Sequence, residues 1–148
     1  MEIQSDFKEL LALFNAQSVE YIIVGGYALA FHGAPRFTGD IDIYVKPSKD
    51  NSERIIASLR EFGFGNIGLS EGDFSKPDQV IQLGVPPVRV DIITSLSGVN
   101  WEESDKEKVM GDYGGIPVNY IGRRQFIANK KASGRKRDLA DLEELGEE

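Results

Sequence analysis

Apolar residues recur along the chain in two different periods, and these periods predict a sheet flanked by helices. Residues 5–17 carry apolar side chains at helical spacing, which predicts an amphipathic helix capped by Ser5 or Asp6. Residues 48–64 repeat that pattern, and residues 101–110 predict a charged helix. Shorter apolar or alternating runs predict strands at 21–26, 40–45, 79–85, 88–96 and 116–121. A short helix is predicted at 27–33 and a loop or irregular strand at 65–78. The residues after 121 predict one or two helices that break near 133–134, with Ser133 favoured over Asp138 as a cap.

The order of these elements mixes helices with strands, and a turn at residues 86–87 joins two of the strands into a hairpin. This pattern predicts an α/β (α+β) fold with a small mixed β-sheet flanked by helices. A chain of 148 residues suits one domain, which we expect to span 1–148 with a basic C-terminal helical segment at 122–146.

The composition restricts the possible chemistry and the expected location. The chain has no cysteine, which excludes disulfides, thiolate metal sites and thiol nucleophiles. It starts with MEIQSDFKELLALF, which lacks the basic start and long apolar run of a signal peptide. Because no apolar run is long enough to span a bilayer, we expect a cytoplasmic protein with no membrane partner.

The charge is distributed unevenly. The net charge is −7, from 17 basic and 24 acidic residues. Residues 120–138 hold seven of the basic residues and one acidic residue, which leaves 10 basic and 23 acidic residues elsewhere. The acidic body argues against general polyanion binding, whereas the basic segment could still hold phosphates locally.

Two aspartates interrupt an otherwise strand-like run at residues 40–45, although aspartate is a poor strand former. Strand alternation puts Asp40 and Asp42 on one face, about 6.6 Å apart along the strand. Asp91 interrupts a similar β-branched run at residues 88–92. A lone Asp-x-Asp pair is more often the solvated face of an edge strand, but Gly25 and Gly26 end an apolar run just upstream and favour a phosphate-binding neighbour.

Three carboxylates that lie close together would raise one another's pKa values, and a divalent cation removes that penalty. Ligand sets made only of oxygen favour Mg²⁺ or Mn²⁺ over zinc. The combination of Asp40, Asp42 and Asp91 with the double glycine therefore predicts a site for a cation and a nucleotide.

These residues resemble the polymerase-β-like nucleotidyltransferase superfamily, through Gly25-Gly26, Asp40-Ile41-Asp42 and a later strand aspartate, Asp91. More narrowly, GGYALAFHGAPRFTGDIDIYV and NKKASGRKRDLADLEEL resemble small nucleotidyltransferase-like proteins related to the AbiEii toxins of type IV toxin–antitoxin systems. Gly26 stands where many members carry serine.

The resemblance implies a role for each matching position. Asp40 and Asp42 would hold the Mg²⁺ or Mn²⁺ ions that bind the triphosphate of an NTP, and Asp91 would complete the second cation site and activate the acceptor hydroxyl. The Gly25 and Gly26 amides would approach the phosphates. Lys130 matches a basic residue that often contacts the triphosphate from a later helix.

The resemblance implies an enzyme that moves an NMP from an NTP to a hydroxyl of RNA, protein or a small molecule, with a cognate antitoxin or other protein as a possible partner. An alternative is a nucleotide-binding or regulatory module of the same fold with weak or no catalysis. A third reading is an interaction protein whose aspartates are ordinary surface residues.

Three further residues have two readings each. Arg36 is either a bidentate phosphate ligand or a loop arginine paired with an acid. Lys130 is either a nucleotide ligand or part of a solvated helix face, and because Lys131 points about 100° away from it, at most one of the two faces the site. We expect His32, the only histidine, to be a helix-end residue rather than a catalyst.

Overall fold

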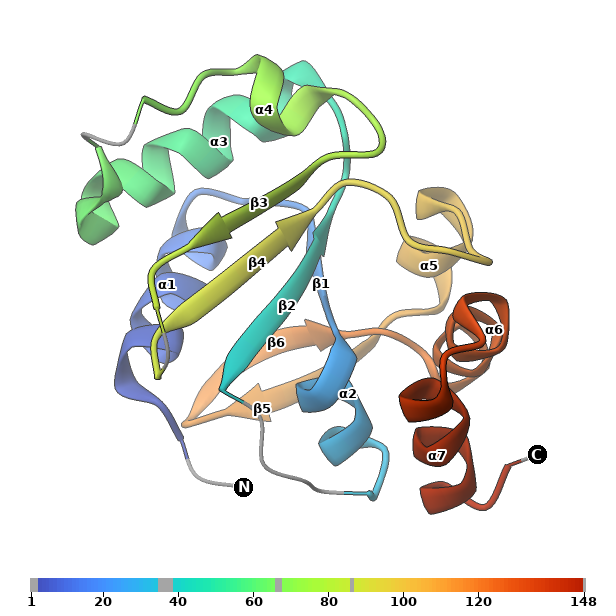
Figure 1. Ribbon diagram of the computed structural model, residues 1–148. Helices are drawn as coiled ribbons and strands as arrows, with labels where there is room; N and C mark the ends of the chain where they lie inside the picture. The colour runs from blue at the N-terminus through green and yellow to red at the C-terminus, as the bar shows by residue number, and fades with distance from the viewer. Residues whose placement is uncertain (1–2, 35–38, 66–67, 86, 148) are drawn as a thin grey trace.

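The computed structural model describes residues 3–34, 39–65, 68–85 and 87–147, which form one six-stranded sheet with the order β3-β4-β2-β1-β6-β5 (Figure 1). The β2–β4 and β1–β6 pairs are parallel, and the other three pairs are antiparallel. The strands are β1 (Tyr21–Val24), β2 (Asp40–Val45), β3 (Val80–Leu83), β4 (Arg89–Ile93), β5 (Val109–Tyr113) and β6 (Ile116–Tyr120). The predicted mixed sheet flanked by helices is confirmed.

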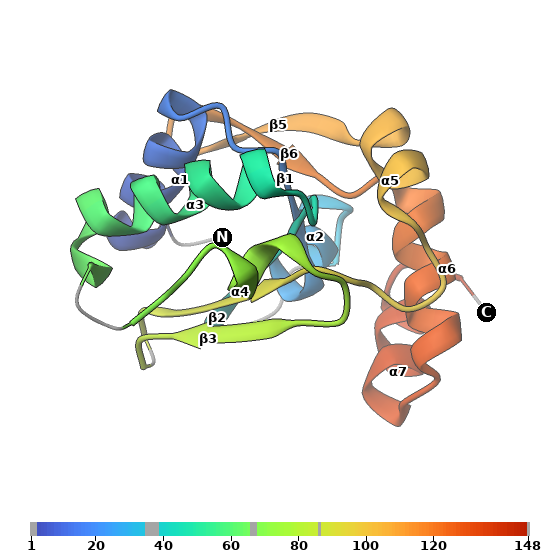
Figure 2. The same cartoon turned by 90° about the horizontal axis from the view of Figure 1, so that it is seen from above.

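Helices flank the sheet (Figures 1 and 2). Helices α1 (Ser5–Ala16) and α3 (Lys49–Leu59) lie on one face, and the short α4 (Gly72–Ser75) contacts α3. Helix α2 (Gly25–Phe31) continues directly from the end of β1, and its Tyr27 contacts Phe7 of α1. Helices α6 (Arg123–Ser133) and α7 (Lys136–Glu144) lie to the side of α2 (Figure 1). Helix α5 (Trp101–Glu107) precedes β5. Within the described residues, no helix combines the length and apolarity that crossing a bilayer would require.

Strand alternation determines which side chains enter the core beneath α1 and α3. Ile41 and Ile43 of β2 and Val90 and Ile92 of β4 are fully buried. Helix α1 supplies its apolar stripe to the same core, namely Phe7, Leu10, Leu11 and Phe14. The intervening positions of β2 and β4 therefore lie on the opposite face of the sheet.

Several predicted boundaries were wrong. Gln4, rather than Ser5 or Asp6, caps α1, because its side-chain oxygen accepts a hydrogen bond from the Asp6 amide. Gly25 and Gly26 begin α2 instead of ending β1. The helix predicted to end at 110 stops at Glu107, since residues 109–113 pair with β6 across a two-glycine turn, at Gly114 and Gly115, in which both φ angles are positive.

The remaining differences concern helices. Helix α3 is followed by a π-helical turn, η1 (Arg60–Phe64), and α4 lies within the segment predicted as loop or strand. The predicted break in the C-terminal helices is confirmed at Gly134, which takes a left-handed conformation with a φ of 65°. Arg135, not Ser133, occupies the N-cap of α7 and makes no side-chain capping bond.

Candidate active site

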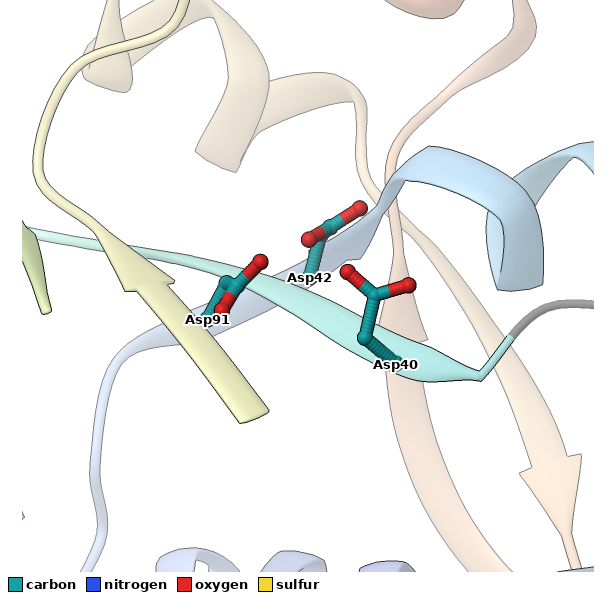
Figure 3. Close-up of side chains that lie close together, drawn as sticks. All are labelled: Asp40, Asp42 and Asp91. Atoms are coloured by element: carbon teal, nitrogen blue, oxygen red, sulfur yellow. The ribbon is translucent and has the colours of Figure 1, made fainter. Parts of the chain in front are cut away.

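Strand register brings together the three aspartates predicted from the sequence (Figure 3). Strand β2 runs parallel to β4 with Asp42 opposite Asp91 and Asp40 opposite Arg89. One carboxylate oxygen from each of Asp40, Asp42 and Asp91 lies within 4.8 Å of the other two. The close-up shows the three side chains rising from the same side of the two strands. The predicted cluster therefore exists as a geometric unit.

Gly25 lies against this cluster because β1 pairs antiparallel with β2 and places Val24 opposite Asp42. Gly25 has a φ of +67°, and a Cβ atom built there would overlap Asp42 Oδ2. Both the backbone conformation and the close approach therefore require glycine. Gly26 follows in the first turn of α2. Gly25 is therefore next to the carboxylates as predicted, whereas the contact of the two glycine amides with phosphate stays a prediction.

The cluster is electrostatically crowded. Burial, together with the charges of Asp40 and Asp91, raises the pKa of Asp42 to about 7, and the positive charge of Lys130 acts in the opposite direction. Three neighbouring carboxylates with no soft ligand form a donor set that fits Mg²⁺ or Mn²⁺. The residues present therefore fit the divalent cation that the sequence predicts.

Lys130 lies nearby but is bound to acids of α7. Its side chain is only 8% exposed, and its Nζ lies 3.3 Å from Asp138 Oδ1 and 3.6 Å from Asp141 Oδ2. The ammonium group also lies 5.3 Å from the centre of the Phe126 ring. Lys131 is exposed, in agreement with the expectation that at most one of these two lysines faces the site.

Sequence reasoning missed Arg89, Asp138 and Asp141. Arg89 donates to Asp91 through its Nε and Nη2 groups, and Asp138 accepts hydrogen bonds from Arg135 as well as from Lys130. The signals were present: Arg89 stands two residues before Asp91 and thus on the same face of β4. Asp138 and Asp141 are spaced to share one face of a helix.

Two other candidates have different outcomes. Arg36 lies outside the described residues, so its predicted phosphate contact stays a prediction. His32 ends α2, and its Nε2 lies 2.7 Å from the carbonyl oxygen of Ile121. This contact agrees with the expected role of His32 at a helix end.

The sequence matches no protein-family model and no curated protein. The structure, however, resembles solved structures over nearly its whole length. A candidate nucleotidyltransferase from Thermotoga maritima matches with a TM-score of 0.63 and 14% identity, covering 96% of this chain and 93% of that one. The lincosamide antibiotic adenylyltransferase LnuA, in its lincomycin-bound form, matches with a TM-score of 0.58 and 14% identity, covering 99% and 98% of the two chains.

A third match is the antibiotic-resistance factor ANT(2'')-Ia, in complex with adenylyl-2''-tobramycin. It has a TM-score of 0.57 and 12% identity and covers 94% of this chain and 84% of that one. At these identities the likeness concerns the fold. The six-stranded sheet and its helices therefore have the nucleotidyltransferase-like architecture that the sequence predicted.

Proposed function

We propose that this protein is a nucleotidyltransferase that depends on a divalent cation and moves an NMP from an NTP to a hydroxyl group. One observation carries the proposal: Asp40, Asp42 and Asp91 bring carboxylate oxygens within 4.8 Å of one another. They do so on a sheet whose fold resembles that of an enzyme named as an adenylyltransferase. A structural surface would not need three acids packed this closely, since their mutual repulsion opposes folding.

Each residue has a proposed task. Asp40, Asp42 and Asp91 would hold the cation, which supplies charge neutralisation and Lewis acidity to the triphosphate when it is bound. The glycine backbone at 25–26 would let phosphate oxygens approach the sheet edge. Lys130, whose charge already lowers the pKa of Asp42, would oppose the negative charge of the triphosphate.

The proposed transfer is a displacement at the α-phosphorus. The acceptor oxygen forms a bond to this phosphorus, and the bond from the phosphorus to the bridging oxygen breaks. Pyrophosphate leaves with the bonding electrons. A carboxylate oxygen of Asp91 takes the proton of the acceptor hydroxyl, so that the products are an NMP ester, pyrophosphate and one proton.

The acceptor belongs to one of three classes: RNA, protein or a small molecule. The lincomycin-bound and adenylyl-tobramycin-bound relatives support the small-molecule class. The AbiEii-like branch, an antitoxin partner and a cytoplasmic location stay predictions from the sequence. A binding module without catalysis is the alternative, and Gly26 favours it because glycine offers no hydroxyl to a phosphate.

Thermal unfolding with each of the four NTPs, with and without Mg²⁺, tests nucleotide binding. A ligand present at 100 times its Kd should stabilise the fold by about 2.7 kcal/mol, which raises the Tm by roughly 5–10 °C for a chain of this size. Asp40→Ala should abolish that rise. If none of the four NTPs raises the Tm, both the enzyme proposal and the binding-module proposal are contradicted.

Transfer of label from radioactive NTPs to total RNA or to a cell extract separates the enzyme from the binding module. Asp42→Ala should abolish the transfer, and circular dichroism should show that the variant is folded. Label transfer that survives in Asp42→Ala would contradict the assignment of the site. NTP binding without any transfer would favour the binding module.

A further inference from the structure

Arg89 and Asp91 form a forked ion pair inside the proposed site. The Nε of Arg89 donates to Asp91 Oδ1 at 3.1 Å, and its Nη2 donates to Asp91 Oδ2, also at 3.1 Å. The two residues stand two positions apart on β4, so both side chains leave the same face of the strand. The pair is therefore built by strand geometry and needs no loop to hold it.

The fork restrains the Asp91 carboxylate more strongly than a single contact would. Two parallel N–H···O bonds hold the planar guanidinium and the carboxylate in one plane and oppose rotation of the carboxylate. Only 11% of the Asp91 side chain is exposed, compared with 35% of the Arg89 side chain. Water therefore competes little for the Asp91 oxygens.

The fork also leaves acceptor capacity on Asp91. Each carboxylate oxygen has two lone-pair directions, and Arg89 uses one on each oxygen. Asp91 stands opposite Asp42 in the register, and Arg89 stands opposite Asp40. The guanidinium thus approaches from the side of residue 40, while Asp91 keeps one oxygen within 4.8 Å of an oxygen of each of the other two carboxylates.

We propose that Arg89 is a positioning residue for Asp91. It fixes the carboxylate so that the lone pairs that Arg89 does not use face the space shared with Asp40 and Asp42, where the cation and the acceptor hydroxyl would meet. This inference rests on the proposed function, because it gives Asp91 a cation to bind. It differs from two simpler roles for Arg89: offsetting charge, and competing with the cation for Asp91.

Arg89→Lys is the decisive variant because it keeps the positive charge and removes the fork. Binding of Mn²⁺ alone to the full chain, measured by isothermal titration calorimetry, needs no knowledge of the acceptor. We expect Arg89→Lys to bind Mn²⁺ about 10- to 100-fold more weakly than wild type, which is the usual cost of losing a partner that orients a metal ligand. In Arg89→Ala, a non-denaturing concentration of guanidinium ion should restore part of the lost affinity.

Arg124→Lys is the matched control, since Arg124 forms a 2.7 Å ion pair with Glu107 on the surface and its side chain is 73% exposed. It should bind Mn²⁺ like wild type. If Arg89→Lys shows no cooperative unfolding transition and is therefore not folded, Arg89→Gln serves as a second variant that lacks the forked ion pair. Once a substrate is known, the Arg89 variants should lower kcat more than they raise the KM for the NTP.

The outcomes separate this inference from the proposed function. Suppose that wild type binds Mn²⁺, that Asp40→Asn abolishes this binding, and that Arg89→Lys binds Mn²⁺ as well as wild type does. The positive charge at residue 89 is then sufficient, and the positioning role of Arg89 is wrong. Tighter binding by the Arg89 variants would mean that Arg89 competes with the cation, which also overturns the inference. If wild type itself binds no Mn²⁺, the proposed cation site is wrong as well.

Discussion

At the scale of single residues, the surroundings of Asp42 disfavour the charged form of its carboxyl group. It lies between Asp91 on one neighbouring strand and the Val24–Gly25 junction on the other. Burial and its two acidic neighbours raise its pKa to about 7, far above the value of a carboxyl group in water. In the absence of a cation, the folded protein therefore holds a proton on Asp42 that the unfolded chain releases near pH 4.

The raised pKa predicts how stability depends on pH. The free energy of unfolding of the cation-free protein should fall by about 2–4 kcal/mol as the pH rises from 4 to 7, because only the folded state still binds the proton in that range. Asp42→Asn should flatten this slope and stabilise the protein at pH 8. Urea unfolding in EDTA at several pH values measures the effect.

Glu144→Gln, at an exposed position of α7, is the control and should leave the slope unchanged. A slope in Asp42→Asn equal to that of wild type would show that Asp42 does not carry the proton.

Gly25→Ala should destabilise the protein and disturb the site together. The left-handed backbone costs a non-glycine residue about 1–3 kcal/mol, and the new methyl group must displace the Asp42 carboxylate. Gly134→Ala is the matched control, because its φ of +65° is nearly the same and a Cβ there meets only the Lys131 carbonyl oxygen at 3.7 Å. Equal losses of Mn²⁺ affinity in the two variants would contradict the contact between Gly25 and Asp42.

At the scale of elements, charged groups join α6 to α7. Lys130 of α6 binds Asp138 and Asp141 of α7, and Arg135 binds Asp138 from the connection between the helices. Burial would raise the pKa of Asp138, but the hydrogen bond from Arg135 and the charge of Lys130 outweigh it and lower the pKa. These ion pairs thus help to hold the two helices together.

Asp138→Asn should lower the free energy of unfolding by about 3–5 kcal/mol, because it leaves Lys130 buried with one fewer counter-charge. Glu147→Gln removes an exposed partner of Arg123 and should cost no more than about 1 kcal/mol. Urea unfolding at pH 7 compares the two variants. Similar losses in both would mean that burial adds nothing to the α6–α7 pairs.

The sequence predicted elements well where pattern and burial agree. The bounds of β2 were predicted at both ends, since the alternation from Asp40 to Val45 has one core face. Strand β5 was missed because Val109 and Met110 are exposed and carry no alternation, and only pairing with β6 makes this segment a strand. Tertiary pairing there outweighed the helical pattern upstream.

In the site, too, the residues with a clear local pattern were predicted and the contacts that depend on tertiary structure were missed. The three aspartates were found because carboxylates in a strand are conspicuous, and alternation fixes the face on which they lie. The binding of Lys130 by Asp138 and Asp141 was missed, because a local charge pattern does not reveal which helix face becomes buried. The basic residues other than Lys130 were interpreted mostly as surface, and this holds for Arg124. Lys130 was predicted as a nucleotide ligand; it does not lie on a solvated helix face, and its contact with a nucleotide stays a prediction.

At the scale of the whole molecule, the fold neutralises much of the basic segment that the sequence singled out. Four of its seven basic residues pair with acids in the described residues: Arg123, Arg124, Lys130 and Arg135. With a net charge of −7, the protein offers little continuous positive surface to a polyanion.

We therefore expect the cation-free protein to pass through a heparin column at about 0.15 M salt, where non-specific polyanion binding is already weak. Glu103→Gln weakens one pairing of Arg124 and should change the elution only slightly. Strong retention of wild type would indicate a nucleic-acid surface and would favour RNA as the acceptor.

The register between β2 and β4 has a consequence for how this protein can change by insertion or deletion. A shift of β4 by one residue would turn Asp91 into the core and bring Val90 or Ile92 to the outer face. Arg89 would move with Asp91, so a single inserted residue would remove both from the site at once. Length changes in this strand should therefore be far less tolerated than substitutions, and the same backbone hydrogen bonds that stabilise the sheet also preserve the arrangement of the acids.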